Sequence, residues 1–157
     1  MKKLLYPLLF LCIFSAPFAP PAGAADFVKP ARKDKCPVCG MFVAKYPKWV
    51  AEIVFKDGSY AVFDGCKDMF KYYFNIKKYE RDKKKEEIAS IFVTEYYSTS
   101  IMKAGDVFFV LGSDVLGPMG HEFIPVKGKE NAETFALDHK GTKILSFDDI
   151  TPEIIPR

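Results

Sequence analysis

The chain has 157 residues, of which 49% are hydrophobic and 27% are charged, and its formal net charge is +3 at pH 7. This nearly balanced charge does not gather into a basic face, which argues against a nucleic-acid partner. The length suffices for one compact domain, or for two small lobes that share a core.

The first 24 residues have the pattern of a secretory signal peptide. Lys2 and Lys3 give a positive start, an apolar run over 4–18 follows, and small residues precede the expected cleavage site at Ala24. Two prolines interrupt the apolar run, which is short for a membrane span. We therefore expect cleavage near Ala24, export to the periplasm and no stable membrane insertion.

The cysteine count raises the questions of lipid anchoring and of redox state. Cys12 follows the bulky Leu11, whereas lipid-attachment sites take a small residue there, so we expect Cys12 to be discarded and the product not to be a lipoprotein. The mature chain keeps Cys36, Cys39 and Cys66, an odd number. In an oxidising compartment an odd thiol needs protection, and a bound metal ion would provide it.

A tether and a sulfur-rich loop open the mature chain. Residues 25–35 are basic and lack hydrophobic periodicity, which predicts a flexible tether. The hexapeptide that runs from Cys36 through Cys39 to Met41 then carries two thiols and a thioether. A Cys-x-x-Cys pair can close a disulfide, hold half of a zinc site or bind copper(I), and the thioether favours copper(I). Metal binding and a disulfide both remain open from these residues.

The next segment predicts a first lobe over residues 36–95. Strands are expected over 49–55 and 60–63, joined by a turn with Asp57 and Gly58 at its tip, and a third over 88–94. The mixed charges of 77–87 between the helix and the third strand indicate a solvated segment.

A helix is expected after Asp64 and Gly65, between the second and third strands of this lobe. Its apolar stripe is made by residues at helical spacing: Cys66, Met69, Phe70, Tyr73 and Phe74. Core packing explains Cys66 on this stripe. A place in the first turn would instead lower the pKa of the Cys66 thiol and expose it, so Cys66 is also a possible additional thiol ligand.

The same order of elements recurs in a second predicted lobe, over residues 96–157. Its expected strands and helix are, in chain order, 107–111, 122–126, the helix 131–140, and 143–147. A turn that carries Met119 and is followed by His121 leads into the second of these strands. His139 lies on the apolar side of the helix and is expected to be structural. The predicted fold is therefore α+β, with two ββαβ repeats.

Motifs in both halves are similar to those of one known family. They are Cys39-Gly40-Met41, Phe63-Asp64-Gly65-Cys66, Val110-Leu111-Gly112-Ser113 and Gly117-Pro118-Met119-Gly120. Together they resemble the nitrous oxide reductase accessory protein (NosL) family. The resemblance implies a pair of ββαβ domains, a fold shared with organomercurial lyase, and an exported copper(I) carrier rather than an enzyme. The implied partner is nitrous oxide reductase or its copper-assembly machinery, and we expect a monomer.

The resemblance also implies a ligand set. Cys39 matches the thiolate ligand of the family, Met41 its companion thioether, and Met119 the methionine of the second motif. Cys36 adds a thiol that shorter motifs of the family lack, and His121 could supply a nitrogen ligand. If the two lobes face each other, these side chains could meet around one Cu(I) ion.

Two other classes of function remain open. A thiol-disulfide oxidoreductase would use Cys36 and Cys39, although that motif usually caps a helix and here a strand-like run follows. An organomercurial lyase would need paired thiols and a carboxylate, for which Asp64 beside Cys66 is available. A zinc-stabilised binding domain would use Cys36, Cys39, Cys66 and His121.

Overall fold

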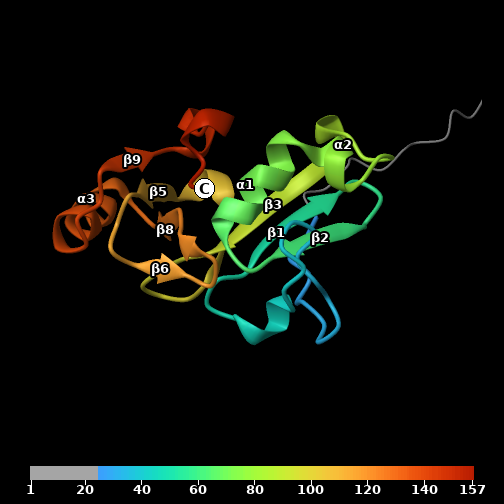
Figure 1. Cartoon of the computed structure of the whole chain (residues 1–157), viewed down its shortest axis with the longest axis horizontal. Helices are drawn as coiled ribbons and strands as arrows, with labels where there is room; N and C mark the ends of the chain where they lie inside the picture. The colour runs from blue at the N-terminus through green and yellow to red at the C-terminus, as the bar shows by residue number, and fades with distance from the viewer. Residues whose placement is uncertain (1–24) are drawn as a thin grey trace, which may run out of the picture.

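The computed structural model describes residues 25–157 (Figure 1). The expected signal peptide, its cleavage site and Cys12 lie outside the described residues. Within residues 25–157, none of the helices has the length and apolar character needed to cross a membrane.

The first lobe is built on a four-stranded antiparallel sheet with the order β2-β1-β3-β4. Its strands are β1 (Ala51–Phe55), β2 (Tyr60–Phe63), β3 (Ile88–Thr94) and β4 (Ile101–Lys103). The turn between β1 and β2 is stabilised by Asp57, whose Oδ1 accepts a hydrogen bond from the Ser59 amide at 3.0 Å. Helices α1 (Cys66–Phe74) and α2 (Ile76–Tyr79) connect β2 to β3.

The second lobe repeats this connectivity. Its sheet has the order β8-β5-β9 and its strands are β5 (Phe108–Leu111), β8 (Ile124–Val126) and β9 (Lys143–Leu145), with α3 (Lys129–Asp138) before β9. In both sheets the first strand is central, the second pairs on one side and the third returns after a helix on the other side. The predicted pair of ββαβ repeats is confirmed, whereas the exact lobe limits stay a prediction.

Shorter elements complete the chain. The ribbon of β6 (Leu116–Gly117) and β7 (Gly120–His121) carries the turn at Pro118 and Met119. In the described part of the chain, 3₁₀ helices lie at Val43–Lys45, Lys85–Glu87, Ala104–Asp106, Phe147–Asp149 and Pro152–Ile154.

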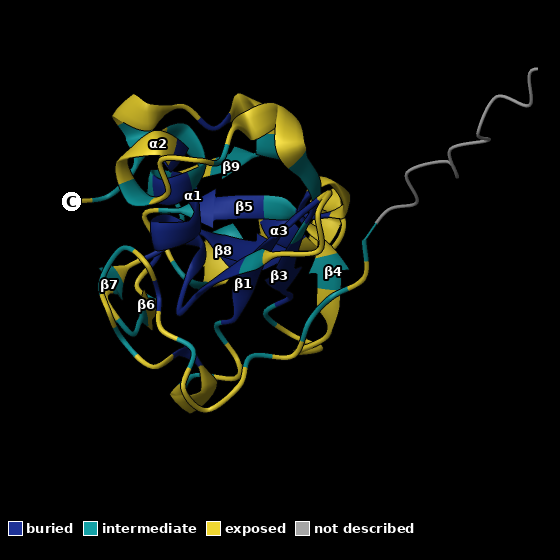
Figure 2. Ribbon diagram, turned by 90° about the vertical axis from the view of Figure 1, so that its right-hand side faces the viewer, coloured by how far each residue is buried: buried dark blue, intermediate teal, exposed yellow. Residues whose placement is uncertain are grey.

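Helix α1 joins the two lobes through one hydrophobic core. The ring of Phe70 on α1 meets those of Phe109 and Phe123 edge to face, with centroid distances of 5.2 and 5.1 Å. Figure 2 shows α1, β1, β3 and β5 as a buried centre, with exposed loops around it. Because these rings come from both halves of the sequence, the lobes pack as one body.

Two segments differ in detail from what the sequence predicts. Residues 25–35 were expected to be a flexible tether, yet Phe27 packs on Phe92 with ring centroids 6.0 Å apart, and the Val28 amide donates to Glu52 Oε1 at 2.8 Å. On α1, the stripe residues Tyr73 and Phe74 pack partly buried against the core, and Tyr72, which the predicted stripe does not include, is fully buried as well. Its ring packs against Phe63 and its hydroxyl finds an acceptor 2.5 Å away on the Glu80 carboxylate, outside the helix.

Candidate metal centre

The cysteine loop is closed at its base and turns sharply at its tip. An isolated β-bridge pairs Lys35 with Phe42. Inside it, the Cys36 amide donates to the Met41 carbonyl and the Gly40 amide donates to the Cys36 carbonyl, each at 2.9 Å. Gly40 has a φ of +80°, a left-handed conformation that favours glycine. These bonds hold the loop in a compact turn that brings the two thiols together.

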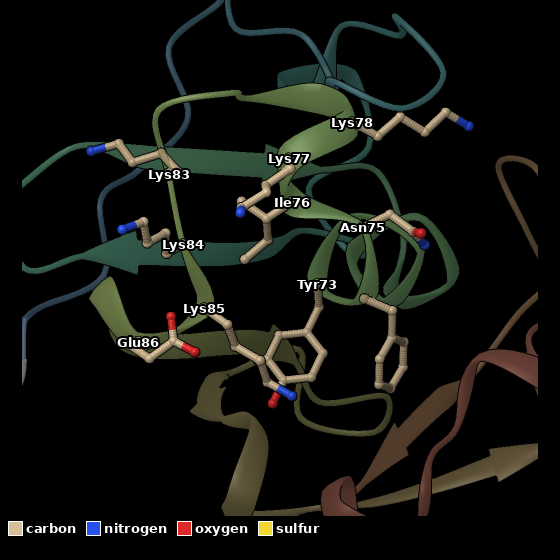
Figure 3. Close-up of a pocket in the computed structure, with 10 residues that line it drawn as sticks. Tyr73, Asn75, Ile76, Lys77, Lys78, Lys83, Lys84, Lys85 and Glu86 are labelled. Carbon is tan, nitrogen blue, oxygen red and sulfur yellow. The ribbon is translucent and has the colours of Figure 1, made fainter.

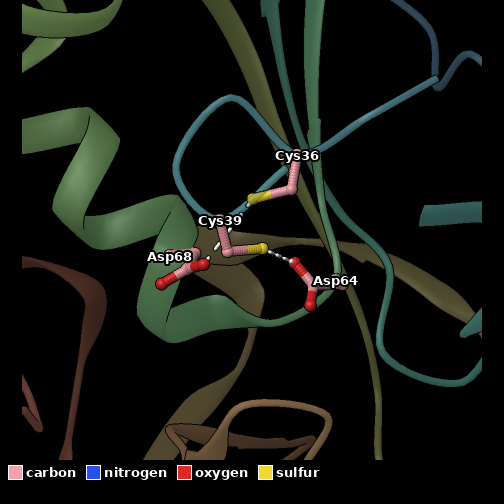
Figure 4. A group of neighbouring side chains, drawn as sticks. All are labelled: Cys36, Cys39, Asp64 and Asp68. Carbon is pink, nitrogen blue, oxygen red and sulfur yellow. Dashed lines mark hydrogen bonds between the residues drawn. The ribbon is translucent and has the colours of Figure 1, made fainter. Parts of the chain in front are cut away.

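Two carboxylates from the neighbouring strand and helix face these thiols (Figure 4). Asp64 follows β2 directly and Asp68 lies in the first turn of α1. The Cys39 thiol donates to Asp64 Oδ1 at 3.1 Å, and the Cys36 thiol donates to Asp68 Oδ2 at 3.6 Å. One ligand atom from each of these four residues lies within 4.8 Å of the others. The cluster therefore offers two sulfur and two oxygen donors to a metal ion.

The surroundings of the thiols keep them protonated at neutral pH. Burial raises the pKa of Cys36 to about 11, and this outweighs the opposing hydrogen bonds from the amides of Cys39 and Val38. Burial also raises the pKa of Cys39, and its hydrogen bond to Asp64 raises it further. Asp64 is itself buried, and its Oδ2 has no hydrogen-bond partner within residues 25–157. A cation at this place would compensate the buried carboxylates and displace the thiol protons.

The other predicted ligands are placed around this cluster in different ways. Met41 is half-buried in the cysteine loop itself. Met119 lies at the tip of the β6–β7 turn with its side chain 45% exposed, and its carbonyl accepts a hydrogen bond from Lys67 Nζ at 2.6 Å. This bond places the turn of the second lobe beside the first turn of α1, the same turn that carries Asp68. His121, on β7, is exposed and is not a member of the thiol–carboxylate cluster.

Cys66 has the first of the two roles that the sequence left open for it, core packing. It is buried in the core with Met69 and Phe70, and it is not one of the four clustered residues in the described part of the chain. Burial raises the pKa of the Cys66 thiol well above its usual value, and the charge of Glu122 raises it further. The expected lowering of this pKa by the helix N-terminus is therefore wrong, because the second lobe covers that end of α1.

The zinc set of Cys36, Cys39, Cys66 and His121 is not assembled within residues 25–157, since the cluster takes Asp64 and Asp68 instead. The three cysteines of this part of the chain are free thiols. His139 has the structural role predicted for it. Its ring stacks on Phe135 at 4.5 Å between centroids, and its Nδ1 lies 3.2 Å from Asp114 Oδ1.

The sequence did not indicate Asp68 as a site residue, and it indicated Asp64 only as a neighbour of Cys66. Asp64 directly follows the buried strand β2, and Asp68 lies four residues further, in the first turn of the following helix. Acidic residues are common there because they favour helix N-termini, so the spacing alone does not point to a thiol partner.

A separate cavity of about 510 Å³ lies away from the cysteines (Figure 3). It is lined by Tyr73, Phe74, Asn75, Ile76, Glu86 and five lysines. The labelled lysine side chains point in different directions, and Lys85 Nζ lies over the Tyr73 ring, 4.1 Å from its centroid. No set of donors converges here, so the thiol–carboxylate cluster is the candidate functional site.

Fold and site together define an α+β protein of two ββαβ lobes with a thiol–carboxylate cluster suited to a metal ion. Residues 27–155 match the NosL family, and the chain belongs to this family. The resemblance inferred from the motifs is thereby confirmed. No curated protein matches the chain.

A solved structure at a TM-score of 0.69 shows the same fold. The crystal structure of the copper chaperone NosL from Shewanella denitrificans matches 85% of this chain and 99% of its own, at 22% identity and a TM-score of 0.69. The solution structure of the apo-NosL protein from Achromobacter cycloclastes is also 22% identical. That match covers 67% of this chain and 87% of its own, with a TM-score of 0.48.

Proposed function

We propose that this protein is an exported metallochaperone that binds Cu(I) and delivers it for maturation of the copper sites of nitrous oxide reductase. The observation that carries the proposal is the convergence of Cys36 and Cys39 within a methionine-bearing loop. The turn that holds Met119 is bonded to Lys67, the neighbour of Asp68 in the cluster. The crystal structure from Shewanella denitrificans, which has the same fold, is that of a copper chaperone. The proposed partner is nitrous oxide reductase or its copper-assembly machinery. We propose that this protein acts as a monomer and meets its partner in the periplasm.

The proposed ligands are Cys39, Met41 and Met119, with Cys36 and His121 as further candidates. Thiolate and thioether sulfur select Cu(I), and a small number of ligands from loops permits release to a partner. Cys39 is only half-buried and Met119 is exposed, so a recipient protein has access to this side of the ion, whereas Cys36 is enclosed. We infer that the copper is handed over from the Cys39 side.

The electrostatics of the thiols favour a carrier over a redox enzyme. A thiol-disulfide oxidoreductase or another thiol enzyme needs a cysteine with a lowered pKa, because the thiolate is the nucleophile. Burial instead raises the pKa of both Cys36 and Cys39. A tightly bound soft cation overcomes this cost by replacing the proton, whereas a catalytic cysteine would remain in its unreactive form at neutral pH.

The test is a competition titration of the reduced mature protein with Cu(I) and a chromophoric Cu(I) chelator, together with metal analysis. We expect one Cu(I) per chain, and we expect Cys39→Ser to abolish tight binding. Cys66→Ala is the matched control, because it removes a thiol that lies outside the cluster, and it should leave the affinity unchanged. A stable zinc equivalent in place of copper, or wild-type affinity in Cys39→Ser, would overturn the proposal.

A further inference from the structure

A buried carboxylate from the second lobe is seated on the first turn of α1. Glu122, next to β7, is 3% exposed. Its Oε1 accepts hydrogen bonds from the backbone amides of Lys67 and Phe123, the latter at 2.9 Å. The first of these bonds joins residues 55 positions apart, so it links the two lobes directly. The proposed metal site makes no use of Glu122.

The Glu122 carboxylate lies against two glycines, which have no side chains to keep it away. A Cβ atom at Gly65 would lie 2.1 Å from Glu122 Oε2, and one at Gly117 would lie 3.2 Å from Glu122 Cγ. Contacts this close leave no room for a larger residue at Gly65 unless Glu122 moves. Two glycines, one from each lobe, thus allow the carboxylate to approach the helix end closely.

Lys67 makes a second link at the same place. Its side chain is almost completely buried, and its ammonium donates to the backbone carbonyl of Met119 at 2.6 Å. Lys67 therefore bonds the second lobe through both its backbone amide and its side chain. The next residue, Asp68, bonds the Cys36 thiol. Because the Met119 side chain is 45% exposed, the core does not hold this turn in place.

We propose that Lys67 and Glu122 form a clamp that positions the Met119 turn against the cysteine half of the copper site. The inference rests on the proposed function, because it assigns the clamp to the Cu(I) ligand Met119. Burying a lysine and a glutamate is costly unless both are bonded, and apolar side chains would join two lobes more cheaply. What the polar pair adds is a defined orientation of the Met119 turn, because hydrogen bonds are directional and Lys67 binds the backbone carbonyl of that turn.

The first experiment compares Cu(I) affinity in Lys67→Leu with that of the wild type. Leucine keeps an apolar side chain in the buried site and, unlike methionine, adds no sulfur ligand. We expect a roughly tenfold weaker affinity, the size of one charge-assisted hydrogen bond. X-ray absorption on the bound copper should show one fewer sulfur neighbour. Lys77→Leu, on the exposed face of α2, is the matched control and should bind as the wild type does.

A double-mutant cycle separates positioning from general destabilisation. If the clamp acts through the thioether, Lys67→Leu should have no further effect on Cu(I) affinity in a Met119→Leu background. Glu122→Ala should reproduce the loss, whereas Glu122→Gln keeps an oxygen that accepts both amide hydrogen bonds and should retain affinity. Additive losses in the cycle, or an unchanged sulfur count in Lys67→Leu, would overturn the proposal.

The clamp is also testable without copper. Amide hydrogen exchange of residues 116–121 in the metal-free protein should accelerate in Lys67→Leu and not in Lys77→Leu. Unchanged exchange would refute the clamp even if the chain binds Cu(I). Conversely, the protein could show accelerated exchange in Lys67→Leu and yet bind no Cu(I). That result would support the link between the lobes, but it would refute the proposed function and the positioning role of the clamp.

Discussion

The substitution Gly65→Ala isolates the contact between the lobes better than any change in the core. Gly65 has a φ of 174°, an extended conformation that alanine adopts without strain. The added methyl group would nevertheless lie 2.1 Å from Glu122 Oε2 and 2.9 Å from its Cδ. The carboxylate must therefore move, and its bonds to the amides of Lys67 and Phe123 are weakened or lost.

The magnitude follows from those two bonds. Leaving a buried donor or acceptor unpaired costs about 1–3 kcal/mol, so losing both bonds should lower the free energy of unfolding by roughly 2–6 kcal/mol. Urea unfolding of the metal-free, reduced protein at neutral pH measures this loss as a lower midpoint with an unchanged slope. A total stability of about 5–15 kcal/mol is usual for a domain, so the change would be easy to detect.

Two further variants decide whether the steric explanation is right. Gly105→Ala adds a methyl group in open space and should change the stability by no more than about 0.5 kcal/mol. In a Glu122→Ala background the obstacle is gone, so Gly65→Ala should cost only about 1 kcal/mol, as expected for alanine at a helix N-cap. Wild-type stability of Gly65→Ala, or an equal loss in both backgrounds, would refute the reasoning.

Three other predictions concern protons and thiols. Burial raises the pKa of Glu52 to about 7, from 4.5 in the unfolded chain, so its stabilising contribution is complete below pH 4.5 and is lost as the pH rises through 7. Urea midpoints should therefore fall between pH 5 and 8, less steeply in Glu52→Gln, and parallel curves would contradict this. Copper affinity should rise with pH, with one to two protons displaced per ion, whereas a pH-independent affinity would indicate a methionine-only site. Asp64→Asn should lower the pKa of Cys39, measured by ultraviolet titration of the thiolate, and an unchanged value would assign the whole shift to burial.

The repeat fold was predictable because each element carries its own local signal. The alternation and the Asp57-Gly58 tip defined the β1–β2 hairpin, and helical spacing placed α1 and α3. The sequence does not predict β4 because it is a short, largely exposed edge strand paired with β3, so its three residues carry no core pattern. The segment around Phe27 escaped for a similar reason, since one aromatic contact and one amide hydrogen bond fix it against the sheet.

The sequence predicts only the part of the site that is formed by neighbouring residues in the chain. Cys36 and Cys39 are three residues apart in one closed loop, so their proximity follows from the motif. Their contacts with Asp68 and Asp64 join residues 32 and 25 positions apart, and only the packing of the loop against α1 creates them. For Cys66 the stripe pattern predicts the core packing that is observed. The alternative of an exposed thiol fails because Glu122, distant in the sequence, fills the helix end.

Both halves of the proposed site, the cysteine loop and the Met119 turn, are bonded to residues in the first turn of α1. Successive residues on an α-helix point about 100° apart, so three neighbours face three different directions. Cys66 enters the core, Lys67 bonds the Met119 turn, and Asp68 bonds the Cys36 thiol. A shift of this turn therefore moves the contacts of the cysteine loop and of the second lobe together. The lobes are joined at the residues that place the candidate ligands, so we expect variants that loosen this turn to change metal affinity before they unfold either sheet.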